Sequence, residues 1–138
     1  MSFHPYLFFG GNCRDAFTRY QEVFGGELVL IRGGDMPEDD RMPGDPELIA
    51  HAALTIGDDL LMGSDDPLAD PFGPVQGMQV NYDAPDAARA TSVFDGLADG
   101  GVVHAPLGPV SFSELFGMCV DRFGTPWMVT VAAPADAA

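Results

Sequence analysis

The side chain best suited to acid–base chemistry in this sequence is His51, which lies inside an apolar, strand-like segment from Leu48 to Ile56. Histidine titrates near neutral pH, so it can take up or release a proton during a reaction. Alternation along a strand places His51 on the face opposite Ala52 and Leu54, which we expect to pack against a helix. His51 is therefore a weak candidate for a catalytic residue, and a structural role for a histidine inside a strand is the alternative.

Three polar side chains could orient a small ligand. Ser64, Gln79 and Asn81 alternate with apolar neighbours on predicted strands. Gln79 and Asn81 share a face because they are two residues apart. Polar groups placed in this way fix the orientation of ligands in mostly apolar pockets. The alternative is that these faces are simply hydrated.

Two aromatic side chains complete the set of candidates. Phe116 ends an expected polar loop over residues 106–116, and apolar residues in such a loop are typical of a lid or a partner surface. Trp127 follows a tight turn at the start of a predicted strand, where a place in the core is the alternative. The ligand-binding candidates are His51, Ser64, Gln79, Asn81, Phe116 and Trp127.

The remaining reactive side chains have simpler interpretations. Cys13 falls in the first turn of a predicted helix, where a thiol pKa can be lowered, but it also lies on the core-facing stripe. The sequence has no CxxC or Cys/His spacing, so we expect Cys13 and Cys119 to be buried free thiols in a reducing cytoplasm. Asp65 and Asp66 follow a strand, and we expect them to be solvated turn residues. No Ser-His-Asp arrangement or phosphate-binding loop is present.

Composition limits the class of protein. The chain has 138 residues, 46% of them hydrophobic, which suits one compact globular domain. Its 21 acidic and 6 basic residues give a net charge of −15, which argues against nucleic acid and anionic membranes as partners. The charge can serve solubility alone or attract cationic ligands. With no apolar run near the roughly 20 residues of a membrane span and no secretory signal, we expect a cytoplasmic protein.

Two segments of the chain, residues 3–26 and 77–100, follow the same pattern. Each contains a short apolar strand, a capping residue, a helix with one apolar face and a terminal glycine. Asn12 and Asp86 occupy the corresponding capping positions. Internal repetition of this length indicates a fold built twice from one unit.

Each unit is predicted to have the order β-α-β-β-β, with its helix covering one face of an α+β sheet. Strands are expected at 3–9, 27–32, 48–56, 60–64, 78–84, 102–105, 118–121 and 126–131, and helices begin after Asn12 and Asp86. Residues 33–47 and 106–116 are expected to be long polar loops. The predicted organisation is a first module at 1–66, a linker at 67–77, a second module at 78–132 and a flexible tail at 133–138, all within one compact domain.

The chain resembles the vicinal-oxygen-chelate superfamily, the glyoxalase and bleomycin-resistance group, and more closely its PhnB-like branch. The resemblance is carried by PYLFFGGNCRDAFTRYQEVFGGE, IAHAALTIGDDLLMGSDD and FGMCVDRFGTPWMV, which together span Pro5 to Val129. It implies two βαβββ modules that form a U-shaped mixed sheet around a cleft. The superfamily includes isomerases, dioxygenases, epimerases, thiol transferases and non-catalytic drug binders, so it implies no single reaction. Relatives in this branch also carry the name demethylubiquinone methyltransferase, but the sequence has no glycine-rich nucleotide loop after a strand, and we expect no methyl transfer.

The resemblance also implies where a metal would be held. Metal-dependent relatives place a histidine on the first strand of each module and a glutamate on the last. In this sequence those positions fall at Pro5, Gln79, Gly63 or Ser64, and Met128. His4 lies one residue from Pro5, but a shift of one residue turns a strand side chain to the other face. Because a catalytic metal usually needs three histidine or carboxylate ligands, we expect neither a metal nor another cofactor.

These observations predict a PhnB-like glyoxalase-fold protein that binds a small molecule in the cleft between its modules without the usual metal. The alternative is a divergent metal-dependent lyase, isomerase or dioxygenase with ligands from other positions, such as His4, His51, Asp65 or Glu114. A purely structural protein, with the cleft filled by side chains, is a third interpretation. Open strand edges and the apolar residues at 112–116 further predict a homodimer.

Overall fold

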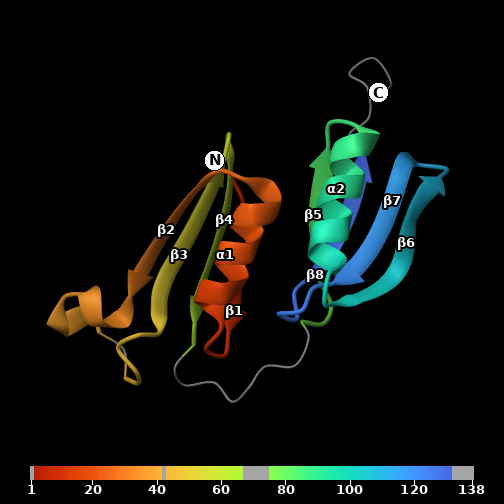
Figure 1. The fold of residues 1–138 in the computed structure, drawn as a ribbon. Helices are drawn as coiled ribbons and strands as arrows, with labels where there is room; N and C mark the ends of the chain where they lie inside the picture. The colour runs from red at the N-terminus through yellow and green to blue at the C-terminus, as the bar shows by residue number, and fades with distance from the viewer. Residues whose placement is uncertain (1, 42, 67–74, 132–138) are drawn as a thin grey trace. The chain divides into compact units, whose positions relative to one another are not determined.

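The computed structural model describes residues 2–41, 43–66 and 75–131. The chain divides into two compact units, Met1–Phe72 and Gly73–Ala138, each with one helix against a four-stranded mixed sheet (Figure 1). The element order in each unit is β-α-β-β-β. This confirms the predicted α+β fold with two βαβββ modules. The predicted linker over 67–77 lies largely, and the tail over 133–138 entirely, outside the described residues.

Unit 1 has the strand order β1-β4-β3-β2, with β1 parallel to β4 and the other neighbours antiparallel. Its elements are β1 (Tyr6–Phe9), α1 (Cys13–Phe24), β2 (Glu27–Arg32), the short 3-10 turns η1 (Gly33–Asp35) and η2 (Glu38–Asp40), β3 (Ile49–Ile56) and β4 (Asp59–Asp65). The strand predicted from Phe3 thus begins only at Tyr6. The parallel β1–β4 pair requires a crossover connection, and α1 is its first part.

The core of unit 1 lies between α1 and the sheet. Ala16, Phe17 and Tyr20 on the helix are fully buried, as are Ala52 and Leu54 on β3, which confirms the predicted facing of that strand. The ring of Phe17 sits directly over Gly63 of β4. A Cβ atom at Gly63 would lie 2.7 Å from the ring carbon Cε2 of Phe17, so the helix approaches the sheet this closely only over a glycine.

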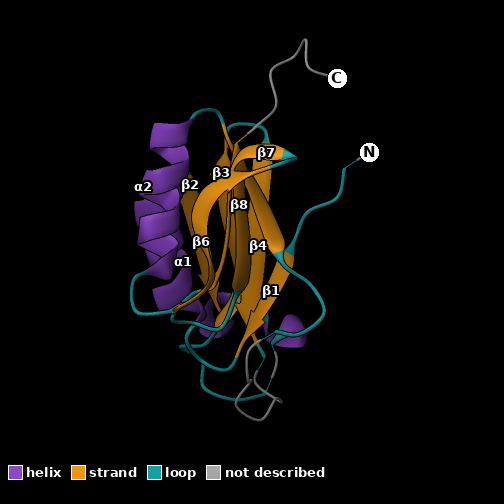
Figure 2. Cartoon of the chain, turned by 90° about the vertical axis from the view of Figure 1, so that its right-hand side faces the viewer, coloured by secondary structure: helices purple, strands orange, loops and turns teal. Residues whose placement is uncertain are grey.

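Unit 2 repeats this plan with the strand order β5-β8-β7-β6. Its elements are β5 (Val80–Ala84), α2 (Ala87–Ala98), β6 (Val102–Val110), β7 (Ser113–Val120) and β8 (Pro126–Val131). Helix α2 packs across this sheet (Figure 2) and buries Val93, Phe94 and Leu97. Phe94 sits over Gly117 of β7, where an added Cβ atom would lie 2.8 Å from the ring carbon Cε2. No helix of the described residues is long and apolar enough to cross a membrane.

The prediction of a polar loop at residues 106–116 is wrong. This segment belongs to a hairpin in which β6 extends to Val110 and β7 begins at Ser113. Pro106 and Pro109 argue against a strand, because proline cannot donate to a ladder. They are tolerated because β6 is the edge strand and its pairing with β7 shifts register at several points.

The two helices begin in different ways. The carboxylate of Asp86 accepts a hydrogen bond of 2.8 Å from the backbone N–H of Arg89, which confirms Asp86 as the cap of α2. Asn12 was predicted to do the same for α1, but its side chain makes no capping hydrogen bond. Instead, Oδ1 of Asp65 accepts from the backbone N–H groups of Gly11 and Cys13, each at 3.0 Å.

Asp65 is therefore not the solvated turn residue that the sequence predicts. Its side chain is 6% exposed, and its second oxygen, Oδ2, accepts from the backbone N–H of Ile49 at 2.9 Å. One carboxylate thus joins the end of β4 to the start of α1 and the start of β3. A buried carboxylate is tolerated in this way only when its oxygens are hydrogen-bonded.

Unit 2 also holds a buried carboxylate, but in its last hairpin. Asp121, 6% exposed, follows β7, and its Oδ1 accepts from the backbone N–H groups of Phe123 and Thr125. Its Oδ2 accepts from Nε1 of Trp127 at 2.8 Å. The turn before β8 and the largest core side chain of this unit are therefore fixed by the same group.

We predict that Asp65→Ala lowers the free energy of unfolding by about 3 kcal/mol, because it leaves three buried or part-buried N–H groups without their acceptor. Asp65→Asn should lower it by roughly half as much, since one amide oxygen can still accept while the amide NH2 faces another donor. Urea unfolding followed by circular dichroism measures both values.

The control is Asp39→Ala, in an exposed turn, which should change the free energy by less than about 0.5 kcal/mol. Equal stability of wild-type protein and Asp65→Ala would show that the carboxylate does not hold these segments together.

Candidate functional site

Each sheet has one face covered by its helix and one opposite face, which we call the open face of that unit. On the open face of unit 1, His51 of β3 lies beside Tyr6 of β1. Their rings are stacked with centroids 5.8 Å apart, and the Tyr6 hydroxyl lies 3.2 Å from Nδ1 of His51. The structure thus places His51 on the predicted face, held by an aromatic neighbour rather than by a carboxylate.

Ser64 of β4 is 7% exposed. It lines a small cavity of about 50 Å³ beside the loop over residues 33–48, together with Asp40, Asp45 and Ile49. The cavity is too small for an organic ligand, which needs roughly 300 Å³ or more. Ser64 and His51 are the two candidates that unit 1 supplies, and His51 is not among the residues that line this cavity.

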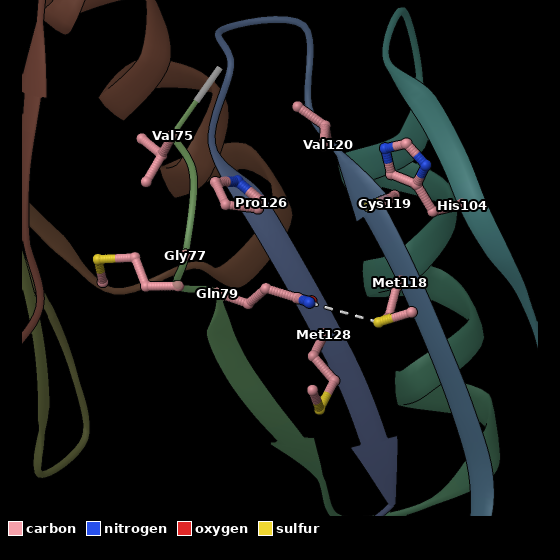
Figure 3. A pocket seen from close by; sticks show the side chains of 10 residues that line it. Val75, Gly77, Gln79, His104, Met118, Cys119, Val120, Pro126 and Met128 are labelled. Atoms are coloured by element: carbon pink, nitrogen blue, oxygen red, sulfur yellow. Dashed lines mark hydrogen bonds between the residues drawn. The ribbon is translucent and has the colours of Figure 1, made fainter.

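The open face of unit 2 carries a pocket of about 500 Å³, which we call the methionine pocket (Figure 3). Its lining residues come from the segment before β5 and from β6, β7 and β8: Val75, Gly77, Met78, Gln79, His104, Met118, Cys119, Val120, Pro126 and Met128. The amide Nε2 of Gln79 donates to Sδ of Met118 over 3.4 Å. Gln79, one of the sequence candidates, is thus a polar group, with His104, of a pocket whose floor is largely apolar.

A second pocket of about 680 Å³ lies on the same open face, and we call it the Thr130 pocket. It is lined by Asn81, Asp83, Val110, Ser111, Phe112, Ser113, Glu114, Met128, Thr130 and Val131. The Thr130 hydroxyl lies 3.3 Å from Oδ1 of Asn81 and donates to Oδ1 of Asp83. Asn81 and Gln79 therefore share a face as their spacing predicts, but each lines a different pocket.

The two aromatic candidates lie in different environments. Phe116 is half-buried on β7, opposite Thr130 in register, and its ring meets that of Phe112 edge-on with centroids 5.2 Å apart. Trp127 is 2% exposed and alternates on β8 with Met128, so it belongs to the core under α2. The structure therefore does not bring Trp127 together with Gln79 and Asn81.

Cys13 and Cys119 are buried free thiols, and burial makes them poor nucleophiles. Burial, with a smaller effect of the nearby Asp65 carboxylate, raises the pKa of Cys13 to about 12. Burial, followed by the effect of Asp121, raises the pKa of Cys119 to about 11. The lowered pKa that a helix N-terminus could give Cys13 is thus outweighed by desolvation.

The residues at the positions implied for a metal do not fit one. In unit 2 these positions hold Gln79 and Met128, and an amide and a thioether are poor ligands for a hard or borderline divalent cation. In unit 1, Gly63 faces the ring of Phe17 on the helix side, and His4 is hydrogen-bonded to Ser2. Among residues 2–41, 43–66 and 75–131, no three His, Cys, Asp or Glu side chains form a group that could hold a metal ion.

The sequence did not identify several residues that line these pockets. Met118 and Thr130 were assigned to strands without a role, although alternation with buried Cys119 and Val129 already places them on the open face. Phe112 was assigned to a lid loop, and Glu114 was considered only as a metal ligand. The β6–β7 hairpin that places these residues was not predicted, because the two prolines of β6 argue against a strand.

Comparison with known proteins agrees on the family. The family model described as 3-demethylubiquinone-9 3-methyltransferase matches residues 1–130. The chain is similar to Protein YjdN of Escherichia coli K12, with 32% identity over 95% of both chains. It is similar to the crystal structure of PA1353 from Pseudomonas aeruginosa, with 41% identity, a TM-score of 0.86 and coverage of 95% of this chain and 97% of that one.

Further solved structures extend the likeness. A PhnB protein from Bacillus cereus, which also bears the name of the methyltransferase, shares 27% identity with a TM-score of 0.77 over 96% of this chain and all of the other. A glyoxalase-related enzyme from Fulvimarina pelagi shares 17% identity with a TM-score of 0.60 over all of this chain and 96% of that one, which is a likeness of fold alone.

We predict that neither thiol of the native protein reacts with Ellman's reagent at pH 8 on the timescale of a free cysteine. A pKa raised to about 12 for Cys13 and about 11 for Cys119 leaves only about one thiolate in a thousand or fewer at that pH. Absorbance at 412 nm measures the reaction, and the same protein in urea should release two equivalents. Rapid reaction of the native protein would contradict the burial of these side chains.

Proposed function

Because this chain belongs to the PhnB-like branch of the vicinal-oxygen-chelate superfamily, within the family described as 3-demethylubiquinone-9 3-methyltransferase, we propose that it binds a small organic molecule on an open sheet face without a divalent metal. The observation that carries the proposal is the methionine pocket. Gln79 and Met128 occupy the positions of the second module where metal-dependent relatives are implied to carry histidine and glutamate, and both line this pocket.

The chemistry of the pocket suits binding by contact rather than by coordination. Thioether side chains are flexible and polarisable, so they adapt to ligands of different shape. The amide of Gln79 supplies a hydrogen-bond donor, and its present acceptor is the sulfur of Met118, which is a weak acceptor. A ligand oxygen placed near Nε2 of Gln79 would be a better partner. The methionine pocket thus offers a mostly apolar surface on which Gln79 and His104 are polar groups that can orient the ligand.

The proposal does not include methyl transfer, despite the description of the family model. Methyl transfer requires a bound methyl donor beside the acceptor, and the sequence has no glycine-rich loop of the kind that holds a nucleotide-bearing donor.

We also propose a cytoplasmic location. The support is the pair of free cysteines, both buried, as is usual for proteins of a reducing compartment. Fractionation of cells that produce the tagged chain tests this location.

We predict that protein purified without chelator contains sub-stoichiometric transition metal and that its melting temperature is unchanged by EDTA. Ligand-induced shifts in melting temperature against a metabolite panel should identify a binder. Gln79→Ala should reduce that shift, because it removes a polar group of the methionine pocket.

The matched control is Gln76→Ala, which removes another exposed glutamine close by that is not among the pocket residues. One equivalent of bound metal, with an activity that EDTA abolishes, would overturn the proposal and favour a divergent metal-dependent lyase, isomerase or dioxygenase.

We further propose a homodimer and predict a solution mass of about twice 14.6 kDa by light scattering at micromolar concentration. Support comes from β6, an edge strand that leaves Val102 58% and Val103 45% exposed. Val102→Lys should shift the mass toward the monomer, because a lysine on an edge strand opposes strand pairing. A monomeric mass for the wild-type chain would contradict this proposal.

A further inference from the structure

We infer that the open face of unit 2 is an extended site for an organic cation with an apolar body, held across the methionine pocket and the Thr130 pocket together. The inference rests on the proposed function and adds the class of the ligand. It follows from three observations: the two pockets share a lining side chain, their ends differ in chemistry, and the carboxylates in their lining are not balanced by lysine or arginine.

The two pockets adjoin at strand β8. Met128 lines both pockets, so the methionine pocket and the Thr130 pocket meet at this side chain. Gln79, just before the neighbouring strand β5, and Asn81, on β5, lie one in each pocket. Their volumes of about 500 and 680 Å³ are each in the range of organic ligand sites. A ligand longer than either pocket can therefore lie across Met128.

The end at the methionine pocket is apolar. Met118 and Met128 point toward this pocket from β7 and β8, with Val120 and Pro126 beyond them (Figure 3). The amide N–H of Gln79 is the donor on this floor and is paired with sulfur. This end suits the hydrocarbon or aromatic body of a ligand, since thioethers make favourable contacts with aromatic rings.

The end at the Thr130 pocket carries two carboxylates and an aromatic ring. Asp83 lies on β5 beside Thr130, which donates to it, and Glu114 lines the pocket from β7. Phe112 is 71% exposed and is held edge-on by Phe116, so its ring face is available. Carboxylates attract a cation by charge, and an aromatic face attracts it through the ring quadrupole.

The rest of the lining disfavours anions. None of the described residues that line the two pockets is lysine or arginine, and His104 is the basic side chain among them. An anionic ligand would lose its hydration beside Asp83 and Glu114 with no cationic side chain to replace the lost water. The net charge of −15 adds a long-range field that attracts cations to the protein. Charge complementarity therefore favours a cationic ligand over a neutral one and a neutral one over an anion.

The test uses three probes that share one ring system and differ in charge: the cation 1-naphthylmethylammonium, the neutral alcohol 1-naphthylmethanol and the anion 1-naphthaleneacetate. Equilibrium dialysis at low ionic strength, read by naphthalene fluorescence, gives the affinity of each for the full chain. The ammonium should bind roughly tenfold more tightly than the alcohol, since two nearby carboxylates supply about 1.4 kcal/mol. The acetate should not bind measurably, and added salt should weaken the ammonium alone.

Variants locate the charge effect. Asp83→Asn and Glu114→Gln should each weaken ammonium binding several-fold and leave the alcohol unchanged. Asp95→Asn is the control, because it removes the same charge from an exposed position on α2, outside both pockets. Met128→Ala should weaken the ammonium and the alcohol alike, because it removes the contact that both pockets share.

The inference is wrong if the ammonium and the alcohol bind equally, or if Asp95→Asn weakens the ammonium as much as Asp83→Asn does. It is also wrong if none of the probes binds while the metabolite panel yields a neutral or anionic ligand that depends on Gln79. In that last case the proposed function is retained, and only the proposed class of ligand is rejected. Stoichiometric metal with metal-dependent activity would instead overturn the proposed function itself.

Discussion

The hydrogen bonds of the Asp65 carboxylate are the constraint on which unit 1 depends. The carboxylate lies at the end of β4, and its two oxygens accept hydrogen bonds from the backbone N–H groups of Gly11, Cys13 and Ile49. These belong to the turn before α1, the first residue of α1 and the first residue of β3. Burial of the charge is unfavourable by itself, so the arrangement is stable only while all three donors remain in place. The helix and two strands are thereby tied to one point, which fixes the face that the sheet leaves open.

Unit 2 builds the same topology with local interactions, and this difference decides what the sequence could predict. Asp86 caps α2 through an N–H three residues away, a spacing that the sequence displays directly. The acceptor for Cys13 lies 52 residues away in the chain, and nothing near Asn12 indicates it. The helix bounds were nonetheless predictable in both units, because the apolar stripe and the terminal glycines set them regardless of which group caps the N-terminus.

The parts of the candidate site that depend on alternation along a strand could be predicted. The part formed by a segment whose residues disfavour a strand could not. The faces of His51, Gln79 and Asn81 followed from a period of two. The β6–β7 hairpin did not, because its prolines are acceptable only on an edge strand, and edge position is a property of the assembled sheet. Phe112 and Glu114 were therefore placed in a loop. Trp127 was ambiguous because its partner, Asp121, looks like an ordinary turn residue in the sequence.

In the proposed function, the glutamine and methionine at the positions implied for a metal change which properties of a ligand an open sheet face can distinguish. A metal selects ligands by donor atoms in a fixed geometry, whereas flexible thioethers contact many shapes with similar energy. Selection by shape is then weak at the methionine pocket, and an apolar body alone distinguishes few molecules. Charge is the remaining property that differs strongly between ligands, and the carboxylates of Asp83 and Glu114 stand beside that apolar floor. Under the proposed function, selectivity on this face therefore depends on electrostatic complementarity more than on steric fit.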